Sequence, residues 1–146
     1  MLNNDEKALL ILEKAVEIAS SEIVKKETFN PFLLLMDEND EIRTFNNDID
    51  DSTDSYNKLS ETAIKEVKKG NVSVLVLVVD TIMPDKFNSD EPNTIRLHLE
   101  EAHLINEKIS ARYIFVPYNL YKDKEDEIFI DLGKPTPVAF PAEFIK

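Results

Sequence analysis

The sequence predicts a single α+β domain, residues 1–146, in which two main helices pack on a mostly antiparallel sheet of five or six strands. Three observations support this two-layer fold. A Val-rich run is typical of a central strand, two long segments have helical periodicity, and short apolar runs between turn residues are typical of hairpins. The predicted order is α-β-β-α-β-β-β-β.

The run Val72–Asp80 is the most apolar stretch of the chain, and Val, Leu and Ser fill all of it before the closing Asp80. Side chains alternate between the two faces of a strand, so this strand is apolar on both faces. We expect the helices to cover one face. The second face then needs the C-terminal tail, or a second copy of the protein in a symmetric homodimer.

The first half of the chain is predicted to contain two helices around one hairpin. Residues 4–26 form an amphipathic helix capped by Asn3 or Asn4. Its inward stripe is predicted to be Leu9, Leu12, Val16, Ala19 and Ile23. Strands 32–36 and 41–45 are joined by an acidic turn, and a second helix at about 54–69 stops at Gly70.

The second half is predicted to be mainly strands. Prolines predict a loop at 81–93, and a strand at 112–118 ends at Pro117 before a charged turn and its partner at 127–132. From Gly133 the prolines exclude a central strand, so apolar residues there predict an extended, docked tail.

The segment 94–110 fits two patterns. Ile95, Leu97 and Leu99 alternate with polar residues, which favours a strand over 94–101, whereas apolar spacing through Ile109 also fits a helix. Periodicity alone does not decide between the two structures, and the strand is the reading that we favour.

Three short motifs carry a resemblance: Phe29-Asn30-Pro31-Phe32, the stretch 94–100 (Thr-Ile-Arg-Leu-His-Leu-Glu), and 113–118 (Tyr-Ile-Phe-Val-Pro-Tyr). With the Val-rich strand, they resemble a loose family of small uncharacterised bacterial proteins. The resemblance implies a strand at Ile95, although the longer connection at 102–110 departs from the family pattern. It implies no activity. The element order is also similar to the profilin and roadblock folds, which is a likeness of topology alone.

Composition limits the partners. The chain has 29 Asp and Glu against 17 Lys and Arg, a net charge of −12, so its surface repels nucleic acid and anionic membranes and favours a basic protein partner. It lacks Cys, a secretory signal and a membrane-spanning run, which predicts a cytoplasmic protein.

Catalytic and metal-binding motifs are weak. His98 and His103 are five residues apart, which does not fit the helical zinc motif, and the acidic loop 48–54 lacks the glycine of a calcium loop. Gly70 and Gly133 are the only glycines, so no phosphate-binding loop exists. We therefore expect no cofactor, no metal and no catalytic residue.

The arginines are the most suggestive set, because the chain has three and all lie in predicted strands. Arg43 and Arg96 are expected to face outward with His98, and Arg112 joins them if the register allows. Together with Tyr118 they predict a cationic spot that binds a carboxylate of a partner. The alternative is cross-strand pairing with Glu41, Glu100 or Glu127.

Two hypotheses of function follow. The first is a non-catalytic, acidic protein-interaction domain, of immunity or adaptor type, that contacts a more basic protein or a second copy of itself. The second is a small-ligand-binding protein or enzyme with a pocket between the sheet and the C-terminal tail, using Arg96, His98 and Tyr118.

Overall fold

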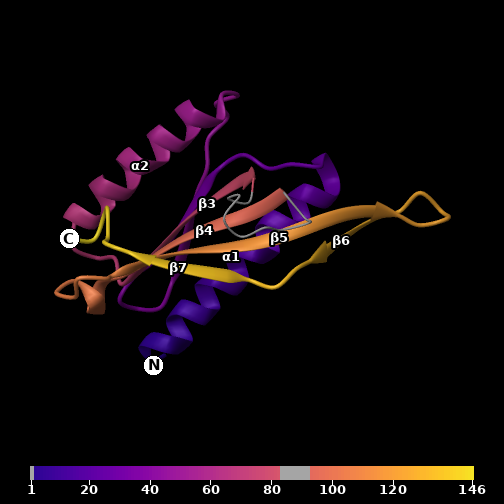
Figure 1. The fold of residues 1–146 in the computed structure, drawn as a ribbon. Coiled ribbons are helices and arrows are strands. Elements are labelled where there is room, and N and C mark those ends of the chain that lie inside the picture. The colour runs from indigo at the N-terminus through magenta and orange to yellow at the C-terminus, as the bar shows by residue number, and fades with distance from the viewer. Residues whose placement is uncertain (1, 83–92) are drawn as a thin grey trace.

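The computed structural model describes residues 2–82 and 93–146 (Figure 1). It confirms the α+β class, the antiparallel sheet and the predicted order of elements, and adds a last strand within the tail. The elements are α1 (Asn4–Lys26), β1 (Phe32–Met36), β2 (Ile42–Phe45), α2 (Ser52–Lys68), β3 (Val74–Ile82), β4 (Asn93–Glu101), a 3₁₀ turn (Ala102–Leu104), β5 (Ala111–Lys122), β6 (Ile128–Leu132) and β7 (Thr136–Phe140).

The strands follow the order β2-β1-β3-β4-β5-β6, and β7 also pairs with β5. Residues 111–115 of β5 pair with β7, and residues 118–122 pair with β6. The prediction that this strand ends at Pro117 is wrong, because β5 runs on to Lys122. Pro117 lies where β5 changes partners, and its carbonyl accepts a hydrogen bond from the Gly133 N–H at 2.7 Å. The β5–β6 hairpin extends away from the rest of the sheet (Figure 1).

The ambiguous segment is a strand. β4 covers Asn93–Glu101, and only Ala102–Leu104 form a helical turn. Burial explains the outcome, since residues on both faces of β4 are covered, whereas a helix would leave β3 and β5 without the strand between them. Of the loop expected at 81–93, the two ends belong to β3 and β4 and the remainder lies outside the described residues.

The central strand is covered on both faces within one chain. Val74, Val76 and Val78 of β3 pack against α1, whereas Leu75 and Leu77 pack in a second cluster. That second cluster contains α2 residues Leu59 and Ala63 and tail residues Phe144 and Ile145. The expectation that both helices cover the same face is therefore wrong. Each apolar face attracts its own helix, and the tail docks as predicted beside α2.

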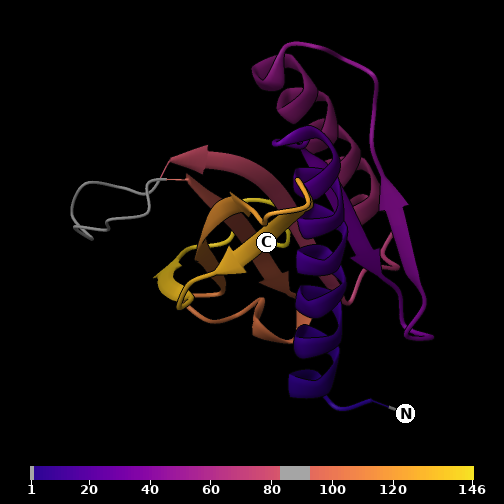
Figure 2. The ribbon, with the colours of Figure 1, turned by 90° about the vertical axis from the view of Figure 1, so that its right-hand side faces the viewer.

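Helix α1 contacts the sheet through three alanines and two isoleucines. Its buried residues are Ala8, Ile11, Ala15, Ala19 and Ile23, so the predicted inward stripe is displaced around the helix, and Leu9 is 59% exposed. Alanines let the helix axis approach the strands closely. Figure 2 shows α1 running lengthwise along the domain. Because the alanines make the contact, the larger Leu12 and Val16 lie half-buried on the flank.

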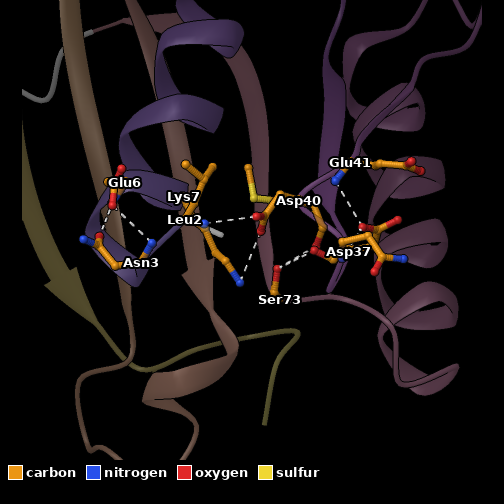
Figure 3. A network of polar contacts seen from close by, with 10 residues as sticks. Leu2, Asn3, Glu6, Lys7, Asp37, Asp40, Glu41 and Ser73 are labelled. Carbon is orange, nitrogen blue, oxygen red and sulfur yellow. Dashed lines mark hydrogen bonds and ion pairs between the residues drawn. The ribbon is translucent and has the colours of Figure 1, made fainter.

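The start of α1 is tied to the β1–β2 turn (Figure 3). Asn3 and Glu6 form a capping box, the Leu2 N–H donates to Asp40 at 3.2 Å, and Lys7 pairs with the same carboxylate at 3.4 Å. Asp37 accepts the Glu41 N–H within the turn. These contacts fix the direction of α1 relative to the hairpin.

Local residues mark both ends of helix α2, with Asp51 before it and Gly70 after it. The acidic loop before it supplies the N-cap, since the Asp51 side chain accepts the Asp54 N–H at 3.0 Å. Gly70 follows the helix with a φ of +80°, a conformation that glycine adopts at little cost, which confirms the predicted stop.

We predict that Leu77→Ala lowers the free energy of unfolding by about 2–5 kcal/mol, because Leu77 is fully buried and the smaller side chain leaves a cavity. Chemical denaturation followed by circular dichroism measures the change. Ile109→Ala is the control, since Ile109 is 58% exposed. A small effect of Leu77→Ala, equal to that of the control, would contradict the central position of β3.

Candidate functional site

The predicted cationic spot does not assemble. Arg43 pairs with Glu66 at 3.2 Å, and Arg112 pairs with Glu101 at 3.2 Å. Arg112 is opposite Leu99 in the register, so it lies on the α1 face of the sheet, whereas Arg43 and Arg96 share the α2 face. Arg112 is expected to join the other arginines only if the register of β4 and β5 allows it. The pairing of Arg112 with Leu99 does not allow it.

Glu66 receives two cations. Burial acts to raise the pKa of Glu66, but hydrogen bonds from Lys69 and Arg43 outweigh burial and hold that pKa below its ordinary value. Arg43 therefore has a structural partner on α2, although not one of the glutamates that cross-strand pairing predicted.

The prediction that His98 faces outward is wrong, because the residue is fully buried. It lies on the α2 face of β4, which the tail covers. Its Nε2 is 2.6 Å from Oε2 of Glu100, which is also fully buried. Two residues apart on one strand, the side chains share a face, and burial turns that spacing into a direct contact.

Glu100 binds the C-terminal tail through the backbone. Its Oε1 accepts the N–H groups of Phe144 at 3.0 Å and Ile145 at 2.8 Å, and its Oε2 accepts that of Glu143 at 2.9 Å. Burial acts to raise the pKa of Glu100. The hydrogen bonds from His98 and from the Ile145 and Glu143 backbone outweigh burial and hold that pKa below its ordinary value. The charged carboxylate is thus the receptor for the tail.

Aromatic rings enclose His98. Its ring lies 5.1 Å from Tyr113, 5.2 Å from Phe140 and 5.1 Å from Phe144, measured between centroids. The Nδ1 atom is buried and has no hydrogen-bond partner among the described residues. His98 and Glu100 are both fully buried, so side chains fill the space between this part of the sheet and the tail.

Tyr118 is buried on the α1 face, away from Arg96 and His98. Its hydroxyl donates to Oδ1 of Asp80 at 2.8 Å, and Thr28 donates to Oδ2 at 2.6 Å. Burial and the contact with Asp80 raise the pKa of Tyr118 well above its ordinary value. Tyr118 therefore joins β5, β3 and the loop after α1 instead of contributing to a surface.

Arg96 differs from the other arginines. Its guanidinium lies 4.8 Å from the Tyr113 ring centroid and 5.8 Å from that of Tyr56, and it lines a pocket of about 470 Å³. Within residues 2–82 and 93–146, no carboxylate lies within ion-pair distance of it. Of the predicted site residues, Arg96 alone faces a pocket.

A larger groove of about 830 Å³ lies between α1 and the strands. Its lining is almost entirely apolar: Leu12 and Val16 from α1, Leu97 from β4, Ile114 and Val116 from β5, and Leu132, Pro135 and Pro137 from the C-terminal part of the chain. Glu13, Glu17 and Lys134 line it as well. None of the residues predicted for a pocket between the sheet and the tail, Arg96, His98 and Tyr118, lines this groove.

Comparison with known protein families, with curated proteins and with solved structures finds no match. Among the described residues, no helix is long and apolar enough to cross a membrane, and no group of three or more potential ligands is arranged to hold a metal ion.

Sequence reasoning missed Glu100 and the groove. The signal for Glu100 was its spacing of two from His98, which places both on one strand face, but the cover over that face comes from residues 43 positions or more away. For the groove, the sequence offers only the spaced alanines Ala8, Ala15 and Ala19 of α1. Their position relative to the sheet depends on which side of the helix packs against the strands.

We predict that Glu100→Gln lowers the free energy of unfolding by about 2–4 kcal/mol, because a neutral amide loses the charge-assisted bonds to the tail. Hydrogen exchange should report faster exchange of the Phe144 and Ile145 amides in the variant. Glu143→Gln, at an exposed position of the same tail, is the control. Unchanged exchange in the Glu100 variant would show that packing alone holds the tail.

The lowered pKa of Glu100 also predicts acid sensitivity. Its stabilisation is complete above its ordinary pKa of 4.5 and is lost as the pH falls through the lower value of the folded state. The stability difference between the wild type and Glu100→Gln should therefore be large at about pH 7 and small at about pH 3. Urea denaturation at both pH values measures it, and a constant difference would contradict the assignment.

Proposed function

We propose that this chain is a non-catalytic, cytoplasmic protein-interaction domain, of immunity or adaptor type, and that the apolar groove beside α1 is its docking surface. The proposed occupant is an amphipathic segment of a partner protein that carries Lys or Arg beside its apolar face. One observation carries the proposal: the groove is wide and apolar, and its helical rim is acidic.

The shape of the groove suits a helix or extended segment. Leu12 and Val16 line it from α1, Ile114 and Val116 from β5, and Leu132, which is 41% exposed, from β6. Apolar side chains of a partner inserted there remove surface from water on both molecules, at about 25 cal/mol per Å². Amphipathic helices dock in grooves of this kind through side chains spaced three or four residues apart.

Charge favours a basic partner over a second copy. Glu13 and Glu17 lie one turn apart on the rim of α1, and the whole chain carries a charge of −12. A segment with Lys or Arg beside its apolar face gains from both features. Two copies of this acidic chain repel each other, and α2 and the tail already cover the second face of β3, so burial of that face no longer requires a homodimer.

The alternative occupant is a small apolar molecule. The Oγ of Ser20, which also lines the groove, is buried without a hydrogen-bond partner among the described residues. A ligand with one carbonyl or carboxyl group on an apolar body could accept that hydroxyl. Of the three charged residues that line the groove, Lys134 attracts a carboxylate, but Glu13 and Glu17 repel one, and this balance favours the basic peptide segment.

The test uses two amphipathic helical peptides, one of Leu and Lys and one of Leu and Glu, with a long-chain fatty acid as the third probe. We expect the Lys peptide to bind, and to shift the methyl signals of Leu12, Val16 and Val116 in NMR spectra. The Glu peptide should not bind. Preferential binding of the fatty acid would assign the groove to a small ligand and overturn the proposal.

Matched variants locate the surface. Val16→Asp places a charge within the groove and should abolish binding of the Lys peptide, because an ion cannot be buried there unpaired. Ile64→Asp is the control on α2, at a site 43% exposed and outside the groove. The double charge reversal Glu13→Lys with Glu17→Lys should transfer preference to the Glu peptide. Equal loss of binding in the Val16 and Ile64 variants would contradict the assignment.

A further inference from the structure

Arg96 has hydrogen-bonding capacity that the described part of the chain does not use. Its Nε is buried and donates to no partner, and none of its guanidinium nitrogens forms an ion pair with a described carboxylate. Buried donors in native proteins nearly always have partners, so an unsatisfied one calls for an explanation. Arg43 and Arg112, by contrast, each pair with a glutamate within the described part of the chain.

The guanidinium is held in place without being neutralised. Tyr113 and Tyr56 contact it through their ring faces, at centroid distances of 4.8 and 5.8 Å, which stabilises the cation without an ion pair. Tyr113 belongs to β5 and Tyr56 to α2, so tertiary packing holds Arg96 in place. A rigid fork of N–H groups is suited to bidentate binding of a carboxylate or phosphate.

Arg96 and Tyr56 line the same pocket of about 470 Å³, a volume suited to a small metabolite. Ser52 and Thr53, the first residues of α2, line it too. The first N–H groups of a helix have no partner within the helix, and the helix dipole favours an anion there. The pocket therefore combines an arginine that has no ion-pair partner among the described residues with the start of a helix, where Asp51 already accepts the Asp54 N–H.

The acidic residues of the pocket define the other end of a ligand. Asp80 and Asp50 line it as well, and Asp80 already accepts hydrogen bonds from Tyr118 and Thr28. Carboxylates repel an anion but accept hydrogen bonds from hydroxyl or ammonium groups. We infer that this pocket binds a small bifunctional ligand, whose carboxylate or phosphate group pairs with Arg96 and whose hydroxyl or ammonium group faces Asp80.

This site is independent of the groove, because the two share no lining residue. The two proposals can therefore fail separately. Long-range repulsion by the net charge of −12 also suppresses unspecific anion binding, so a saturable signal would identify a specific site.

The test is an NMR titration of the full chain with inorganic phosphate, acetate, glycerol phosphate and glycine. We expect saturable shifts of the Ser52 and Thr53 amides and of the Tyr56 ring, with glycerol phosphate binding more tightly than phosphate, or glycine more tightly than acetate. The first result would identify phosphate esters as the ligand class, and the second would identify amino acids. Absence of saturable shifts with all four probes would overturn the inference.

Two charge-matched variants complete the test. Arg96→Gln should weaken binding by about tenfold or more, because the charged fork is lost. Arg43→Gln removes the same charge from an arginine that pairs with Glu66 outside the pocket, and it should bind as the wild type does. Arg96→Lys keeps the charge without the fork and tests the site if Arg96→Gln fails to fold. Equal binding by the Arg43 and Arg96 variants would show unspecific attraction and overturn the site.

Discussion

The sheet is apolar on both faces, and the remaining architecture follows from covering both within one chain. β3 lies between β1 and β4, with Val side chains toward α1 and Leu side chains toward α2 and the tail. Neither helix can be omitted, because each covers a face that water would otherwise contact. The two candidate sites lie where this cover is incomplete: beside α1 on one face and at the start of α2 on the other.

The α2 face of β4 changes character along its length. Arg96, His98 and Glu100 follow one another on that face, from a half-buried arginine at a pocket to a fully buried carboxylate that binds the tail. Tyr113 contacts both Arg96 and His98, and its hydroxyl donates to Glu143 of the tail at 3.4 Å. One tyrosine thus connects the proposed ligand pocket to the bound end of the chain. On this strand Glu100 stabilises the fold, and Arg96 is the residue proposed to bind a ligand.

Local pattern was enough to predict most elements. The bounds of α1 and β1, the strand at Ile95 and the Gly70 stop all depend on short-range signals, and the structure confirms them. The errors concern long-range relations. Burial of His98 depends on the tail, the separation of Arg112 depends on the β4–β5 register, and the placement of α2 depends on which face its chain crosses to. Neither charge nor periodicity contains that information.

Of the candidate site, the sequence indicated Arg96 but neither its aromatic neighbours nor the groove. Arg43, Arg96 and Arg112 look equivalent in a list of strand residues. The difference between them comes from whether a glutamate reaches each one in three dimensions, as Glu66 and Glu101 do for the outer two.

The alanines of α1 have a consequence for how this surface could change. Ala15 and Ala19 are fully buried between the helix and the strands, and they determine how far the helix axis stands from the sheet. A larger side chain at either position would act as a spacer, lifting the helix and with it the wall formed by Leu12 and Val16. Substitutions at these buried positions would therefore change which ligands fit the groove, without altering any residue that contacts the ligand.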